Sequence, residues 1–238
     1  CALPISAMDP KEKEKIESDP NRFGFLTVEM ANQKRKHAYI GEIAPVKIRA
    51  WLPIQSQAEL RSGIQPQSQA FTLHNVNNRP EQTREIRDGK QYLVVTWFGG
   101  ISATKAGTHP ASLSLKAKVA VPDVSKQVLR QQRVPMIEKD VTLTSADQFI
   151  EIRPLPSEGK PADFQGAVGE FHFDALEIPQ QWNIGEPQKV AVRISGSGNF
   201  SYLKAPAVAP VGIWKMYAGQ DQFTPADNAS FAGSKVFQ

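Results

Sequence analysis

Apolar and polar residues alternate along most of the chain from Phe23 onward. This alternation predicts β-strands, because successive side chains of a strand point to opposite faces of the sheet. The alternating segments are residues 25–30, 46–51, 71–73, 92–97 and 113–119 in the first half, and 149–152, 168–176, 190–194 and 213–217 in the second. Short connections rich in Gly, Pro and Asn separate them, and these connections leave no room for crossover helices between parallel strands. The sequence therefore predicts an all-β fold.

The first 22 residues follow a different pattern. Asp9 is expected to cap a short helix that has Pro10 at its first position and Glu12 three residues after the cap. Residues 11–18 are almost all charged or polar, so this helix has no apolar face with which to dock. We therefore assign residues 1–22 to a charged N-terminal arm.

One segment of the first half recurs in the second half. Residues 40–49 align without gaps on residues 184–193, at an offset of 144, and Ile, Gly, Glu, Val and Arg recur at matching positions. The repeat predicts a glycine turn followed by an alternating strand in each half, and hence two tandem β-sandwiches, over residues 23–140 and 141–238. Residues 235–238 resemble only the beginning of the strand at 92–97, so we expect the second sandwich to be incomplete and the native chain to continue.

Composition and charge narrow the possible functions. The 238 residues are 40% hydrophobic and 22% charged, which is typical of a folded globular protein, and no apolar run is long enough to span a membrane. The net charge is only +4, and the basic clusters at 34–37 and 116–139 lack interleaved aromatic residues, so nucleic acid is not an expected partner. Cys1 is the single cysteine, so no internal disulfide can form.

No motif for catalysis or cofactor binding stands out. Residues 196–200 contain two glycines but precede no helical pattern, so they indicate a turn or bulge and not a phosphate loop. His172 with Asp174 is a minimal metal pair. The pairs Glu151 with Glu170 and Asp163 with Glu177 are candidate acid and base residues of a glycosidase. Two ligands do not define a metal site, and nothing fixes the separation of the carboxylates. We therefore predict a protein that is not an enzyme and has no catalytic residues, metal or cofactor.

A more specific signal lies in residues 152–200. It comprises Arg-Pro-Leu-Pro at 153–156, Gly-Lys-Pro at 159–161, Phe-Gln-Gly-Ala-Val-Gly-Glu-Phe at 164–171, Ile-Gly-Glu at 184–186 and Ile-Ser-Gly-Ser-Gly-Asn-Phe at 194–200. The first half adds Tyr-Ile-Gly-Glu at 39–42, Gly-Lys-Gln-Tyr at 89–92 with Trp97, and Thr-Lys-Ala-Gly at 104–107. In order and spacing these segments resemble the BatD family of bacterial envelope proteins, which is associated with oxygen tolerance, or aerotolerance.

The resemblance implies tandem immunoglobulin-like domains on the periplasmic side of the bacterial inner membrane, with a C-terminal transmembrane helix that is absent from this sequence. It also implies a non-enzymatic scaffold for protein binding in an envelope stress response. The partners it implies are von Willebrand A-domain membrane proteins and a MoxR-type AAA+ ATPase system. The alternative is a carbohydrate-binding or adhesin-like sandwich, which requires Trp51, Trp182 or Trp214 to be exposed for stacking on a sugar.

Structural roles are expected for the residues that carry the resemblance, which are Pro154, Pro156, Phe164, Gly166, Ala167, Val168, Gly169, Gly185, Glu186, Gly196, Gly198 and Asn199. The prolines suit a rigid linker between domains, in which Phe164 is expected to act as a plug. Gly166 and Gly169 bracket Ala167 and Val168 and permit a bulge or a close backbone contact. Asn199 is expected in a left-handed turn.

Overall fold

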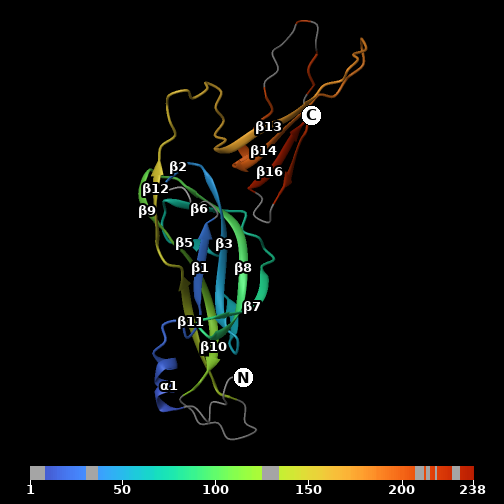
Figure 1. Cartoon of the computed structure of the whole chain (residues 1–238). Coiled ribbons are helices and arrows are strands. Elements are labelled where there is room, and N and C mark those ends of the chain that lie inside the picture. Colours follow the sequence, from blue (N-terminus) through green and yellow to red (C-terminus); the bar gives the residue numbers. More distant parts are fainter. Residues whose placement is uncertain are drawn as a thin grey trace.

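The computed structural model describes residues 9–30, 37–124, 134–206, 212, 215–217, 219–226 and 231–238. These residues form four β-sheets, one α-helix and a short 3₁₀ helix, so the predicted all-β fold is confirmed (Figure 1). None of the helices in these ranges is long and apolar enough to span a membrane.

The strands of the first half are β1 (Phe25–Met30), β2 (His37–Tyr39), β3 (Ile43–Pro53), β4 (Gln57–Leu60), β5 (Gln65–Pro66), β6 (Phe71–His74), β7 (Glu81–Arg87), β8 (Lys90–Ala103), β9 (Gly107–Ala111), β10 (Leu113–Pro122), β11 (Met136–Thr144) and β12 (Gln148–Arg153). Those that follow are β13 (Gly169–Glu177), β14 (Ala191–Gly198), β15 (Asp221–Pro225) and β16 (Ala232–Phe237).

Two antiparallel sheets of the first half pack face to face. Sheet A has the strand order β1-β3-β8-β6, and β7 also pairs with β8, whereas sheet C has the order β11-β10-β4 with β5 beside β10. Alternate residues of both sheets point inward and form one apolar core, in which Ile48 of sheet A and Leu115 of sheet C are almost fully buried. Sheet B, of order β2-β12-β9, contributes Ile152 to the same core.

Most of the strands predicted from alternation are present. Eight of the nine predicted segments overlap observed strands, namely β1, β3, β6, β8, β10, β12, β13 and β14. The prediction for residues 213–217 fails where it can be examined, because residues 215–217 form no strand, while residues 213 and 214 lie outside the described ranges. The predicted boundary at residue 140 falls inside β11. Strand β11 pairs with β10, and β12 pairs with β2 and β9. Strand pairing within the first half therefore continues to Arg153.

The predicted N-terminal helix is present as α1 (Pro10–Glu17). The Asp9 carboxylate caps it by accepting a hydrogen bond of 2.8 Å from the Lys11 backbone N–H, and Pro10 occupies the first turn as expected. None of its residues is buried. Residues 18–22 of the predicted arm form turns after the helix, and residues 1–8 lie outside the described ranges.

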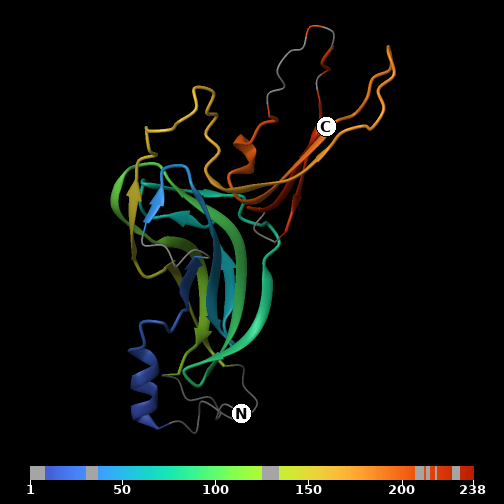
Figure 2. The ribbon, with the colours of Figure 1, turned by 45° about the horizontal axis from the view of Figure 1, so that its top comes forward.

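Sheet D of the second half has the order β13-β14-β16-β15 and repeats the arrangement of β1, β3, β8 and β7 in sheet A (Figure 2). The two sheets also agree in register. Val28, Ile48 and Trp97 lie side by side on β1, β3 and β8, and Leu176, Val192 and Phe237 do so on β13, β14 and β16. Ile48 and Val192 differ by the offset of 144 found in the sequence. The repeat therefore corresponds to one sheet pattern that the chain forms twice.

A phenyl ring of the second half packs against sheet A of the first half. Phe231, just before β16, is 4% exposed and packs with Ile43 and Phe98 of sheet A. Its position depends on Gly100 of β8, since a Cβ atom there would lie 2.5 Å from both the Ile43 side chain and the Phe231 ring.

Replacing Gly100 by alanine is expected to lower the free energy of unfolding by about 1–3 kcal/mol, the usual cost of overpacking a filled site. Gly63→Ala is the matched control, because nothing lies within 4 Å of a Cβ at that position. Urea unfolding followed by circular dichroism measures both variants. Equal stabilities for the two would show that Phe231 does not occupy the space beside Gly100.

Candidate interaction site

Sheet D presents one apolar and one polar face. Residues opposite each other in register share a face, which places Phe173 with Ile194 and Leu176 with Val192 on the apolar side. The apolar face also carries Phe171, Phe223, Phe237, Asp221 and Lys235. The polar face carries His172, Asp174, Arg193, Ser195, Gln222, Thr224 and Ser234. Such a sheet needs a second layer on its apolar side.

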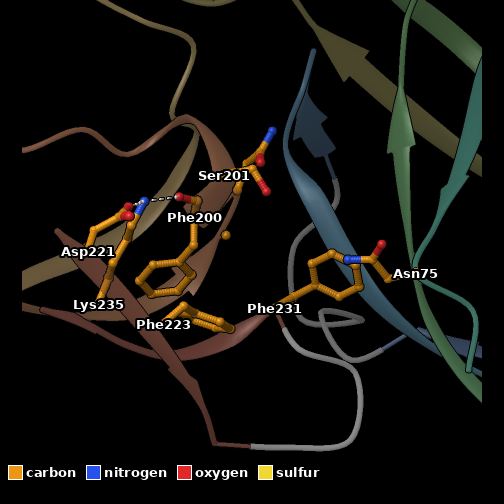
Figure 3. A pocket seen from close by; sticks show the side chains of 9 residues that line it. Asn75, Phe200, Ser201, Asp221, Phe223, Phe231 and Lys235 are labelled. Atoms are coloured by element: carbon orange, nitrogen blue, oxygen red, sulfur yellow. Dashed lines mark hydrogen bonds and ion pairs between the residues drawn. The ribbon is translucent and has the colours of Figure 1, made fainter.

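The 3₁₀ helix η2 (Phe200–Tyr202) covers one end of the apolar face. The Phe200 ring lies 5.1 Å from the Phe171 ring and 4.7 Å from the Phe223 ring, measured between centroids. Beside it, a cavity of about 290 Å³ reaches from Phe200 and Phe223 to Phe231 and Asn75, so it lies where the two halves of the chain meet (Figure 3).

Lys235 holds η2 on the sheet. It is 8% exposed, and its Nζ donates hydrogen bonds to the carbonyl oxygens of Phe200 and Leu203, at 3.3 and 2.9 Å. The same ammonium group forms an ion pair with Asp221 of β15. The hydrogen bond from Lys235 holds the pKa of the Asp221 carboxyl below its ordinary value. The charge of Lys235 is therefore compensated, as a buried charge requires.

The other end of the apolar face is open. Phe173 is 61% exposed and Leu176 is 49% exposed, although both lie on the side of sheet D that carries the phenyl rings. Further large apolar side chains are exposed in the connection from β13 to β14, at Ile178, Trp182 and Ile184. Exposed apolar surface is a general feature of interaction sites, which makes this end of the face the candidate site.

The glycines that carry the family resemblance sit where backbones meet. A Cβ atom at Gly169 would lie 2.4 Å from the Ser197 carbonyl oxygen, and one at Gly198 would lie 2.6 Å from the Gly169 Cα atom. Gly166 instead faces a side chain, since a Cβ atom there would lie 3.3 Å from the Tyr202 ring. The Val168 carbonyl accepts a hydrogen bond from the Asn199 N–H. The predicted close backbone contact around Ala167 and Val168 is therefore present. It fixes the linker after β12 to the start of η2.

The remaining signature residues lie apart from this cluster. Pro154 and Pro156 are exposed in the segment between β12 and β13. Gly185 has φ +82° and Gly41 of the first half has φ +80°, so the repeated glycine has the same backbone conformation in both halves. In each turn the following glutamate accepts a hydrogen bond from the residue three positions before it, at Tyr39 N for Glu42 and at Asn183 Nδ2 for Glu186.

Three details of the predicted roles are wrong. Asn199 has φ −85° and so does not adopt the left-handed conformation, whereas Gly198 has φ +147° and takes the conformation that disfavours a side chain. Residues 196–198 are the end of strand β14 and not a turn. The ring between the two halves is that of Phe231, whereas Phe164 is half-buried with the Lys160 Nζ 5.3 Å from its ring.

The candidate metal pair has no further ligand among the described residues, and the carboxylate pair Glu151 with Glu170 is not brought together. A β-bulge separates Phe173 from Ala175, and the Asp174 carboxylate accepts a hydrogen bond from the Ser195 hydroxyl at 2.8 Å. In the part of the chain that the structure describes, no three His, Cys, Asp or Glu residues gather around a possible metal position. Glu151 lies in sheet B beside Arg153, and Glu170 lies in sheet D, so this carboxylate pair is divided between two sheets.

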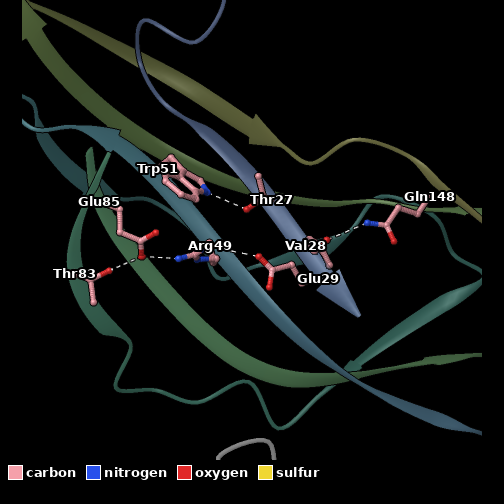
Figure 4. Close-up of polar contacts among 8 residues, drawn as sticks. All are labelled: Thr27, Val28, Glu29, Arg49, Trp51, Thr83, Glu85 and Gln148. Carbon is pink, nitrogen blue, oxygen red and sulfur yellow. Dashed lines mark hydrogen bonds and ion pairs between the residues drawn. The ribbon is translucent and has the colours of Figure 1, made fainter. Parts of the chain in front are cut away.

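Trp51 does not offer a free face to a sugar. It lies on the outer side of sheet A, is 5% exposed and donates its indole N–H to the Thr27 hydroxyl at 2.9 Å (Figure 4). Phe25 stacks on its ring, and the guanidinium groups of Arg49 and Arg87 lie 4.8 and 5.2 Å from its centroid. Trp182 is 41% exposed, and Trp214 lies outside the described ranges.

Sequence reasoning missed Lys235, Phe231 and the open part of the apolar face. Lys235 interrupts the apolar alternation of its strand, but its partners are fixed only by the fold. Phe231 follows a short polar stretch and has no periodic neighbours. The alternation in residues 168–176 does identify the two faces of β13, yet it does not reveal whether another layer covers Phe173.

Comparison of the chain with models of protein families, with curated proteins and with solved structures gave no significant match.

Replacing Lys235 by methionine is expected to raise the pKa of the Asp221 carboxyl toward its ordinary value, because the hydrogen bond that stabilises the carboxylate is lost. In the native protein, the pKa of this carboxyl is lower in the folded state than in the unfolded state. The ion pair therefore contributes its full stability at pH values above the unfolded pKa, and this stability is lost as the pH falls through the folded pKa. An NMR titration of the Asp221 carboxyl carbon measures the change. Lys189→Met, at an exposed lysine, is the control that should leave this pKa unmoved.

Proposed function

We propose that this protein is a non-enzymatic scaffold module that binds other proteins on the periplasmic side of a bacterial inner membrane. In this proposal its two halves are immunoglobulin-like units of a BatD-type oxygen-tolerance system. A membrane anchor, the von Willebrand A-domain partners and the MoxR-type ATPase system belong to the same proposal, since they come from the resemblance in sequence alone.

The observation that carries the proposal is the open apolar end of sheet D. Phe173 and Leu176 are exposed on a face whose counterpart in the first half forms the core of a sandwich. Exposure of large apolar side chains is unfavourable at about 25 cal/mol per Å² of apolar surface, so a partner that buries them gains affinity. The side chains here suit contact with protein, because they are aliphatic and aromatic and the charges nearby are already paired.

The alternative, a carbohydrate-binding module, depends on a single described tryptophan. Of the three tryptophans that the structure describes, Trp182 is exposed, whereas Trp51 and Trp97 are buried. Quenching by acrylamide with and without oligosaccharides tests it. Protection of Trp182 fluorescence by a sugar would favour this alternative.

A pull-down from solubilised bacterial membranes, with the purified chain as bait and mass spectrometry as readout, tests the proposed function. We expect specific recovery of a von Willebrand A-domain protein or a MoxR-type ATPase. The bait must first be shown to be folded by circular dichroism. Recovery of neither protein by a folded bait would contradict the proposal.

A further inference from the structure

We propose that the two halves of this protein form a hinge, with its pivot in residues 154–163 and its latch at Phe231. In the latched state the Phe231 ring occupies a socket on sheet A. In the released state the ring leaves the socket and the second half rotates about the pivot. The inference concerns the fold itself and applies whichever molecule the protein binds.

No strand pairing joins the two halves among the residues that the structure describes. Sheets A, B and C consist of strands from β1 to β12, and sheet D consists of strands from β13 to β16. A ladder of backbone hydrogen bonds across the boundary would fix the orientation of sheet D, because those bonds would have to break before the halves could rotate. The orientation therefore depends on the linker and on side-chain packing.

Residues 154–163 are the part of the linker that can rotate. All of them except Leu155 are exposed. Their hydrogen bonds within the described chain stay inside the linker, as in the bond from the Lys160 N–H to the Ser157 carbonyl oxygen. Nothing lies within 4 Å of a Cβ position at Gly159. A hinge needs a few loop residues that absorb the backbone rotation, and an exposed segment that is hydrogen-bonded to neither half provides them.

The rest of the linker is attached to the second half. The Lys204 Nζ donates a hydrogen bond of 2.9 Å to the side-chain oxygen of Gln165, and the Asn199 N–H donates one of 3.1 Å to the Val168 carbonyl oxygen. Val168 also faces the first half, since a Cβ atom at Gly41 would lie 3.8 Å from its side chain. This contact lies next to the pivot, where a rotation displaces atoms least.

Phe231 is the latch, because its ring is the buried group through which the second half holds sheet A. With Ile43 and Phe98 it forms the one buried apolar cluster, among the described residues, that contains side chains of both halves. The Phe231 carbonyl oxygen accepts a hydrogen bond of 2.8 Å from the Gly198 N–H of β14, so the ring is anchored to sheet D. Gly100 forms the floor of the socket, and the ring fits there because no side chain occupies that place.

The space beside the latch makes its release possible. The cavity of about 290 Å³ separates Phe231 and Asn75 from Phe200 and Phe223 (Figure 3). The halves are thus not close-packed on this side of the ring. Release exposes the Phe231 ring and its socket but breaks no strand pairing, so the released form is a minor state of the same folded chain.

The distance between spin labels on the two halves measures their relative orientation. Labels are attached at Gln57→Cys on β4 and at Thr224→Cys on β15, which are exposed positions, in a chain that carries Cys1→Ser. Double electron–electron resonance gives the distribution of distances. Circular dichroism checks that each labelled variant is folded.

Two variants attack the latch from opposite sides. Phe231→Ala removes the ring, whereas Gly100→Ala keeps the ring and fills its socket from sheet A. The matched controls are Phe149→Ala, at a phenyl ring that is 72% exposed, and Gly63→Ala, at a glycine with open surroundings. We expect one narrow distribution for the labelled chain and both controls. In the two latch variants the released population should rise by about ten-fold or more, since burial of one phenyl ring changes an equilibrium constant by at least that factor.

Three results would overturn the inference. The first is a narrow, unshifted distribution in a latch variant that circular dichroism shows to be folded. The second is a broad distribution in the labelled chain without a latch substitution, because the halves would then not be held. The third is equal broadening in latch and control variants. If one latch variant does not fold, the other decides, and the membrane pull-down tests the proposed function by a separate readout.

Discussion

The burial of one apolar sheet face governs the arrangement of this protein. Sheets A and D each carry a row of large apolar residues across three strands, and the opposite face of sheet D is polar. Sheet A satisfies the requirement through sheet C, so that Ile48 is completely buried. Sheet D satisfies it in part, with η2 and Lys235 at one end. Phe173 and Leu176 belong to the same apolar face but stay exposed, because η2 covers only one end of it.

Packing at the junction of the two halves depends on glycines, whose lack of a side chain leaves room for neighbouring atoms. Gly100 leaves room for the Phe231 ring, and Gly169 and Gly198 let two backbones approach to a distance that a Cβ atom would prevent. Lys235 adds a charged group in the same region, and its hydrogen bonds to two carbonyl oxygens satisfy acceptors of η2. Close packing and paired charge together fix the end of sheet D that faces sheet A.

The sequence predicted the parts of the fold that depend on local alternation. Strands β1 and β10 alternate clearly, and the repeat located the glycine turns at Gly41 and Gly185. Strand β11, which contains the predicted boundary at residue 140, has no alternation to predict it, because most of its residues are polar and exposed. The roles of Phe231 and Lys235 depend on contacts between residues far apart in the chain, which periodicity does not encode.

The edge strands differ in what they expose to solvent. Strand β7 is polar and charged at most positions, and β11 carries Lys139 and Asp140 near its middle, so these two edges resist pairing with other chains. Strand β13 is also an edge, yet it places Phe173 and Leu176 in solvent on one face. A bulge at Asp174 breaks its regular pairing but leaves both apolar side chains on the same side. Charged residues thus interrupt these three edges, and β13 has a bulge in addition. What sets β13 apart is that Phe173 and Leu176 stay exposed on a face whose counterpart on β1 packs against strands β10 and β11.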